Sequence, residues 1–163
     1  MAKKLQLSDE FATLIKDKLT GQITVVGSDM SITTTADQVS TNLKLDTLIA
    51  SVGDKLTLDT NTNSIKIGDG VSYVSVSCGC CIIHNSSGMT YHALRLTKNF
   101  SSISNLKWAQ TKGQYSPSTY GYTTLSDILI PVKKGDTIQM SVFNRIAGTF
   151  TAGQMYMSVR VVK

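Results

Sequence analysis

Three cysteines and a histidine lie close together in the sequence and are the first candidates for chemistry. Cys78, Cys80 and Cys81 fall within four positions, and His84 follows shortly after them. Structural zinc usually takes two pairs of ligands from separate segments, and the only other histidine is His92. On a strand, the first two thiols share one face and the third points to the other, so three thiolates cannot easily converge. We therefore predict no metal, no cofactor and free thiols, which are typical of a reducing cytosol.

Catalytic motifs give no support for an enzyme. The run Asp59–Asn63 begins like a calcium loop, but Ser64 and Gly70 stand where that loop needs glycine and glutamate. The sequence has no Gly-x-Ser-x-Gly elbow, no His-Glu-x-x-His helix and no phosphate-binding loop. Two aspartates could in principle act as a glycosidase pair, yet nothing in the sequence singles out which ones. We predict no catalytic residues and a protein that binds rather than catalyses.

Aromatic residues in the stretch 107–123 are the best candidates for contact with a ligand. Tyr115, Tyr120 and Tyr122 lie there among Gly, Ser, Thr, Gln and Lys residues. Such side chains offer a large rigid area with a polar tip, which suits binding loops. Trp108 and Tyr122 could instead end strands and point into the core. We favour the core for Trp108 and keep the three tyrosines as ligand-contact candidates.

The composition excludes several classes of protein. The 163 residues suffice for one compact domain of ordinary size. Hydrophobic residues make up 41% and charged residues 17%, a composition that fits neither a disordered chain nor a membrane protein. No apolar run approaches the roughly 18 residues of a membrane span, and the amino terminus lacks the pattern of a secretory signal. The net charge of +5 at pH 7 is too small to indicate a nucleic-acid partner.

The amino terminus has the pattern of a short amphipathic helix. Ser8 is a suitable N-cap, Asp9 and Glu10 fall in the first turn, and Gly21 follows the last turn. A helix this short is marginal alone in water, so its apolar stripe must dock on something. Packing on its own domain and docking on other copies or on a larger partner are both open. The stripe consists of Leu7, Phe11, Leu14, Ile15 and Leu19.

The segment 21–54 gives a mixed pattern. Residues 21–35 are typical of short polar strands with a turn. Thr35 and Gln38 have the spacing of a capping box, which would begin a second helix ending at Gly53. Thr41 is one of several indifferent helix formers there. Helix, strand and mobile chain all remain open for this segment.

From Lys55 onward the apolar residues recur at every second position, as in strands. The pattern predicts a hairpin over 56–67 and further strands over 71–84, 89–97, 106–109, 122–132, 137–145 and 154–162. Short strands separated by Gly, Asn and Ser turns are typical of an antiparallel sandwich or barrel.

Two parts of the chain resemble known families. The stretch Ile65–Ser72, with its Lys-Ile-Gly-Asp-Gly turn, resembles fibre and tail-associated proteins of bacteriophages. Residues 128–161 resemble the end of the jelly roll in the tumour necrosis factor and complement globular-head superfamily. They comprise a strand ending in an apolar pair (128–132), a Gly-Asp turn (135–136), an alternating strand (138–143) and a last strand that closes the chain (155–161). The resemblance covers about residues 65–163 and implies a homotrimer packed around a threefold axis. The fold class we predict is therefore a mainly β, antiparallel jelly-roll sandwich, preceded by a short amphipathic helix and a stalk-like segment.

The last two predicted strands support self-association independently of that resemblance. Apolar groups occur on both faces of 137–143 and of 154–162, although a strand with one face in water should alternate more cleanly. The additional apolar groups suggest burial against a neighbouring copy. These candidate trimer-interface residues are Phe143, Tyr156 and Val162.

Together these inferences predict a trimeric structural protein of a bacteriophage particle. Residues 1–54 would form the anchor and stalk, which dock to capsid or tail proteins or bundle the three chains. Residues 55–163 would form the knob, which binds a host-surface glycan or protein. A head fibre or capsid decoration protein is favoured over a tail fibre or tail receptor-binding protein, because the stalk is short. The protein would be made in the host cytoplasm and reside in the virion. The alternative is a bacterial carbohydrate-binding jelly-roll module outside any virion.

Overall fold

The computed structural model describes residues 21–34, 39–84, 90–102, 110–115, 120–144 and 148–162. Within these ranges the chain forms β-strands and no helix, and hence nothing helical that could span a membrane. The predicted amino-terminal helix and the predicted strand over 106–109 lie outside the described residues. The strands are β1 (Gln22–Gly27), β2 (Met30–Thr34), β3 (Val39–Asn42), β4 (Thr47–Val52), β5 (Leu56–Asp59), β6 (Ser64–Ile67), β7 (Tyr73–His84), β8 (Thr90–Lys98), β9 (Ser101–Ser102), β10 (Gln110–Tyr115), β11 (Tyr120–Pro131), β12 (Thr137–Asn144) and β13 (Gly148–Val162).

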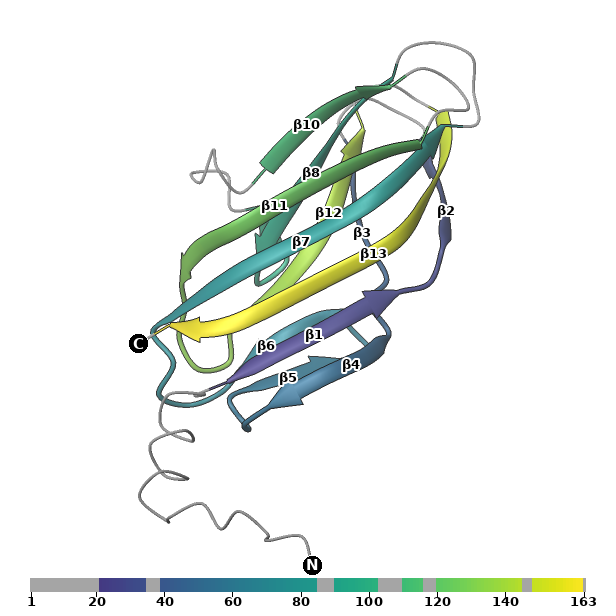
Figure 1. The fold of residues 1–163 in the computed structure, drawn as a ribbon. Helices are drawn as coiled ribbons and strands as arrows, with labels where there is room; N and C mark the ends of the chain where they lie inside the picture. Colours follow the sequence, from purple (N-terminus) through teal and green to yellow (C-terminus); the bar gives the residue numbers. More distant parts are fainter. Residues whose placement is uncertain are drawn as a thin grey trace, which may run out of the picture.

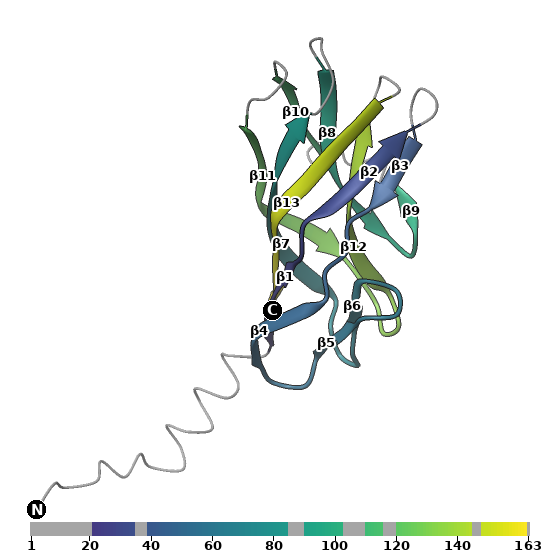
Figure 2. The same ribbon diagram turned by 90° about the vertical axis from the view of Figure 1, so that its right-hand side faces the viewer.

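The strands form two antiparallel sheets that pack face to face (Figures 1 and 2). The first, called here the β13 sheet, has the order β11-β7-β13-β1-β4, with β2 also paired to β13. The second, called here the β12 sheet, has the order β10-β8-β12-β6-β5, with β3 paired to β12 and β9 to β8. The first strand therefore lies beside the last, and few neighbours in a sheet are neighbours in the sequence.

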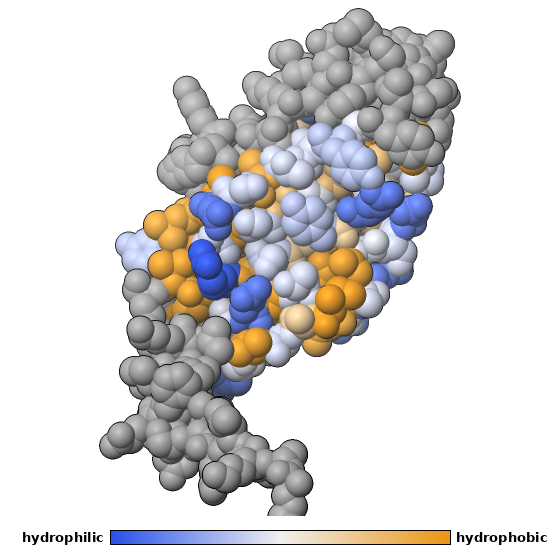
Figure 3. Space-filling model, viewed as in Figure 1, coloured by the Kyte–Doolittle hydropathy of each residue, from blue (hydrophilic) through white to orange (hydrophobic). Residues whose placement is uncertain are grey.

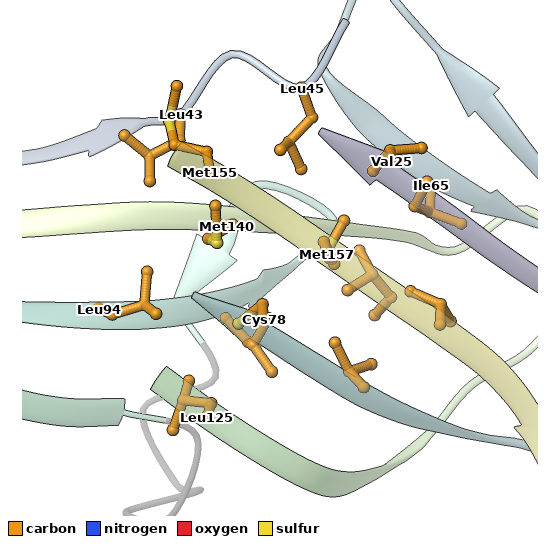
Figure 4. Packing of buried hydrophobic residues seen from close by; sticks show 14 of the residues in the cluster. Val25, Leu43, Leu45, Ile65, Cys78, Leu94, Leu125, Met140, Met155 and Met157 are labelled. Carbon is orange, nitrogen blue, oxygen red and sulfur yellow. The ribbon is translucent and has the colours of Figure 1, made fainter. Parts of the chain in front are cut away.

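Alternation along the strands fills the space between the sheets. Met155, Met157 and Val159 of β13 are buried, as their spacing predicts, whereas Tyr156 between them is exposed. Methionine has no branch and adapts to gaps, which suits a centre shared by several strands. Side chains of both sheets meet there, as Figure 4 shows for Val25, Cys78 and Met157 on one side and Leu94 and Met140 on the other.

The predicted hairpin over 56–67 is present as β5 and β6, which pair with Leu56 opposite Ile67. Its turn holds the amides of Asn61 and Thr62 on the Asp59 carboxylate, at 3.0 and 3.4 Å. The pKa of Asp59 is lowered, chiefly by a hydrogen bond from the Thr62 side chain and further by these two amides, although desolvation acts to raise it. The run that begins like a calcium loop is therefore a hairpin turn.

The segment 21–54 is part of the sandwich where the structure describes it. β1 pairs with β13 on one side and with β4 on the other, so the predicted boundary at residue 54 cuts through a sheet. The predicted second helix is wrong as well, because β3 and β4 occupy its described residues. Leu43 and Leu45 belong to the loop that joins those two strands, and both are completely buried. Burial of these leucines by tertiary packing outweighs the local capping signal.

A candidate interface on the outer face of the β13 sheet

The outer face of the β13 sheet exposes more large apolar side chains than a solvated sheet requires. Strand alternation places Tyr73, Tyr122, Leu129 and Tyr156 on this face, and all four are exposed. They come from three neighbouring strands, β7, β11 and β13. Large exposed apolar areas on a soluble protein often mark a surface that another molecule covers.

Tyr156 lies across β7 rather than pointing straight away from the sheet. A Cβ atom added at Gly79, its partner on β7, would stand 2.7 Å from the Tyr156 Cε1 atom. Such a contact is too close for any side chain, so the glycine leaves room for the ring. Tyr156 is 37% exposed.

Two bulges interrupt the strands on either side of β7. The register shifts between Leu125 and Ile128 and again between Gly153 and Tyr156. Asp127 and Gln154 sit in these bulges with positive φ angles of 53° and 48°. This backbone region is uncommon for residues other than glycine, and bulges re-aim side chains at the surface.

The side chains of the two bulges bind neighbouring strands. The Asp127 amide donates to Ser77 Oγ at 3.0 Å, and Ser75 Oγ donates to Asp127 Oδ1 at 3.2 Å. At the other bulge, Tyr122 Oη donates a hydrogen bond to Gln154 Oε1. Both bulges are therefore fixed by polar contacts across the outer face.

A shallow polar hollow of about 190 Å³ lies beside Asp127 in the middle of this face. The Arg160 guanidinium stands 3.8 Å from the Asp127 carboxylate across the hollow. The other lining residues are Gln22, Ser75, Ser77 and Ser158. Apolar side chains thus surround a polar strip rather than forming one continuous patch.

β4, at the edge of the same sheet, is the second exposed apolar element. Every residue from Thr47 to Val52 is exposed, including Leu48, Ile49 and Val52. The register shift between Thr24 and Val25 of β1 makes Ile49 the additional residue of a bulge. Figure 3 shows orange areas at both sides of this face, over β4 and over the lower end of β11, with white and blue between them.

Only part of the predicted trimer interface lies on this surface. Tyr156 and Val162 are both on the outer side of β13, and Val162 pairs with Tyr73. Phe143 is on β12 in the other sheet and is 8% exposed, with the Arg95 guanidinium 3.8 Å from its ring centre. Its own chain therefore covers most of the ring, with a cation–π contact from Arg95, and the role of Phe143 in a trimer interface stays a prediction.

The predicted ligand-contact tyrosines lie at one end of the sandwich. Tyr122 is exposed on the outer face of the β13 sheet. Tyr115 ends β10 opposite Thr90, and Tyr120 begins β11 opposite Ile83, so their backbones lie at the same end. Their side chains, like the predicted anchor stripe of residues 7–19, lie outside the described parts of the structure.

No sequence pattern had indicated Tyr73, Leu129, Asp127, Arg160 or the exposed side of β4 as parts of this surface. Tyr73 and Leu129 carry a signal that could have been used, since each is a large apolar residue at an outward position of an alternating strand. Asp127 carries none, because its place in a bulge depends on pairing with a distant strand.

The cysteine cluster has the environment of packing residues. Cys78, Cys80 and Cys81 are free and buried. Desolvation raises the pKa of Cys80 to about 12 and also raises the pKa values of Cys78 and Cys81. Thiols with raised pKa values are poor nucleophiles and poor metal ligands. Within the described residues, no group of three His, Cys, Asp or Glu side chains is placed to hold a metal ion.

Comparison with known proteins identifies the fold. No protein-family model matches the chain, and no curated protein matches it in sequence. Among solved structures, the PRD1 vertex protein P5 matches with 17% identity and a TM-score of 0.52, over 89% of this chain and 99% of that one. Eiger TNF from S. frugiperda matches with 10% identity and a TM-score of 0.53, over 87% and 92%. Murine APRIL matches with 9% identity and a TM-score of 0.52, over 87% and 98%.

At these identities the likeness shows the fold alone, and that fold is the predicted one. The chain is an antiparallel β jelly roll of the TNF-like type, and its similarity extends to a vertex protein of the phage PRD1. The resemblance derived from residues 65–163 is confirmed at the level of the fold. It also extends further towards the amino terminus, since the matched structures cover most of the chain.

Proposed function

We propose that this protein is a homotrimeric structural component of a bacteriophage particle, held by its amino-terminal segment and presenting its β sandwich outward for adhesion to a host. The observation that carries the proposal is the fold, which matches the vertex protein P5 of PRD1 over nearly the full length of both chains. The Lys-Ile-Gly-Asp-Gly turn over 66–70 also supports a bacteriophage origin, because it resembles a turn of phage fibre and tail-associated proteins. Binding rather than catalysis is the proposed mechanism.

The two ends of the sandwich support a division between anchoring and presentation. Residue 21 enters the sandwich beside the end of β13, where the Val161 amide donates to the Gly21 carbonyl at 2.8 Å. Tyr115 and Tyr120 lie at the opposite end, beside the end of β7 and the start of β8. An anchor formed by residues 1–20 would therefore leave the tyrosine end pointing away from the particle (Figure 1). This shorter anchor replaces the predicted anchor and stalk of residues 1–54.

The exposed side chains of the β13 sheet support the homotrimer. Tyr73, Leu129 and Tyr156 would be withdrawn from water by neighbouring copies, at roughly 25 cal/mol for each Å² of apolar surface removed. Three copies on one rigid support also give three weak host-binding sites the benefit of avidity. Tyr115, Tyr120 and Tyr122 are the proposed contacts to a host glycan or protein.

Within the particle we propose a head-fibre or capsid-decoration position rather than a tail position. The match to a structure titled as a vertex protein supports this position.

Removal of residues 1–20 tests the proposed anchor. The shortened protein keeps every described strand, so we expect it to fold and to remain trimeric but to be absent from purified particles. The measurement is immunodetection in gradient-purified particles made with the full-length or the shortened protein. Leu14→Asp on the predicted stripe should reduce incorporation, whereas Thr13→Asp beside the stripe is the matched control. Incorporation of the shortened protein at the full-length level would contradict the anchor, and absence of the full-length protein from particles would contradict the virion role.

A further inference from the structure

An apolar groove lies at the end of the sandwich where the amino-terminal segment enters. Its volume is about 300 Å³. Its walls come from the start of β7 with the turn before it, from the end of β13 and from the residue before β5. Figure 1 shows that β13 ends, and β7 and β1 begin, at this same end of the sandwich. The base groove, as it is called here, has the apolar lining residues Val71, Tyr73, Val161 and Val162, together with Lys55 and Ser72.

The described part of the chain leaves the walls of the base groove partly open to water. Tyr73 is 46% exposed, and Val161 and Val162 are only half-buried. A Cβ atom added at Gly70, another lining residue, would meet no described atom within 4 Å. Apolar walls of this kind favour an apolar occupant, because contact with it removes their surface from water.

We propose that the base groove receives Ile15 and Leu19 of the same chain, so that the end of the amino-terminal segment is docked on the sandwich. This inference rests on the proposed function in one respect, namely that residues 1–20 form the anchor, and it adds how the anchor is joined to the sandwich. Leu7, Phe11 and Leu14 of the predicted stripe then remain for contact with the particle. A docked end makes the anchor a fixed extension of the sandwich, which sets the direction in which the tyrosine end points.

The chain enters the sandwich at the wall of the base groove. The Val161 amide donates to the Gly21 carbonyl at 2.8 Å, which holds the residue before β1 against the end of β13. A Cβ atom added at Gly21 would lie 3.0 Å from Val161 Cγ2 and 3.2 Å from Lys55 Cβ, and both of these residues line the groove. Leu19 is two residues before Gly21, and two residues of extended chain span about 7 Å. Leu19 is therefore within reach of the groove.

The covalent connection favours this occupant over a free partner. A segment attached at the rim of a groove has a high effective concentration there, and its docking does not cost the loss of free translation and rotation. Ile15 and Leu19 are four residues apart and share one face of the predicted helix. A helix this short needs a docking surface to be stable. One contact therefore accounts for both the open apolar groove and the end of the apolar stripe.

Engineered disulfides in the full-length protein test the docking. Leu19→Cys is combined with Val162→Cys in the groove or, as the matched control, with Val52→Cys outside it. Gln22 at the start of β1 pairs with Arg160 on one side and with Val52 on the other, so a loose tether would reach both engineered cysteines. The native thiols are buried and stay out of the reaction.

We expect a disulfide within one chain for the Val162→Cys pair, formed roughly tenfold faster than in the Val52→Cys control because docking raises the local concentration of one thiol at the other. Non-reducing electrophoresis under denaturing conditions and mass spectrometry of the digested protein measure it. Equal rates for the two pairs would overturn the docking. Disulfides between chains would also overturn it, since they would show that the segment of a sister copy fills the groove.

Hydrogen exchange decides the question if a cysteine pair fails to fold. The amides of residues 15–20 should exchange about tenfold more slowly in the wild type than in Leu19→Ser, which removes an apolar side chain from the groove. Lys18→Ser, beside the stripe, should leave the exchange as in the wild type. Equal exchange in the wild type and Leu19→Ser would overturn the docking. Failure of the proposed function is read separately, because it would appear as absence of the full-length protein from purified particles.

Discussion

Replacement of Gly27 by valine is expected to destabilise the sandwich by about 3 kcal/mol, the upper end of the usual cost of overpacking, because a clash with backbone cannot be relieved by a change of rotamer. Gly27 ends β1 beneath the loop that follows β3. A Cβ atom at this position would lie 1.9 Å from the Lys44 carbonyl oxygen and 3.0 Å from Met155 Cε. The methionine could move, but the carbonyl belongs to the loop that contains the buried Leu43 and Leu45.

The matched control for this prediction is Gly70→Asn. Gly70 also lies in a turn, but its φ is +75° and nothing lies within 4 Å of an added Cβ. Asparagine tolerates that conformation better than most residues, so we expect a loss below about 1 kcal/mol. Urea denaturation followed by circular dichroism measures both variants. Equal stability of Gly27→Val and wild type would show that the loop does not close over β1 as described.

Asp136→Asn is expected to lower the free energy of unfolding by about 2 kcal/mol at neutral pH, the range for losing hydrogen bonds to a buried charged group. The Asp136 side chain is 4% exposed. It accepts hydrogen bonds from Asn99 Nδ2 at 2.7 Å and from the Lys133 amide at 3.1 Å, with Lys98 Nζ 3.7 Å away. These contacts join the turn before β12 to the turn after β8. Asp69→Asn is the control, since Asp69 is an exposed turn aspartate paired with Lys134 at 3.2 Å and should change stability little.

The pH dependence of the stability difference between wild type and Asp136→Asn tests the contribution of the ionised Asp136 carboxylate. Burial acts to raise the pKa of Asp136, but the hydrogen bonds from Asn99 and Lys133 and the charges of Lys98 and Lys133 outweigh it, so the pKa is lowered. A lowered pKa in the folded state gives stability that is present above the unfolded value of about 4 and is lost as the pH falls through the folded value. The difference between wild type and Asp136→Asn should therefore shrink in acid. A difference that stays constant to about pH 2 would contradict an ionic origin.

The strands of the carboxy-terminal half could be predicted because their pattern is local. In β13 the residues Met155, Met157 and Val159 alternate with Tyr156 and Arg160, and one side of such a strand must be buried whatever it pairs with. The hairpin of β5 and β6 follows in the same way from Leu56 and Ile67. Among the amino-terminal strands, β1 and β2 agree with the polar strand pattern expected over residues 21–35. The local pattern was insufficient for β3 and β4, because β3 owes its conformation to pairing with the distant β12 and β4 to pairing with β1.

Residues of the candidate interface could be predicted only where the alternation along a single strand places them on the outer face. Tyr156 and Val162 are outward positions of a single strand, and the sequence placed them correctly on one face. Phe143 is an outward position as well, but Arg95 from the neighbouring β8 covers it, and a sequence pattern does not show which side chain lies across a strand. The exposed apolar side chains of β4 were missed for a related reason, since Leu48, Ile49 and Val52 fit a buried helix as well as an exposed edge strand.

The molar mass of the purified full-length protein in solution tests the central claim most directly. If sister copies cover the outer face of the β13 sheet, light scattering coupled to size-exclusion chromatography should give three times the chain mass, and this value should persist at low micromolar concentration. Charge placed on the face by Leu129→Asp should shift the protein towards monomer, whereas Lys66→Asp on the β12 sheet should not. A wild-type protein that elutes as a monomer at all these concentrations would contradict the account.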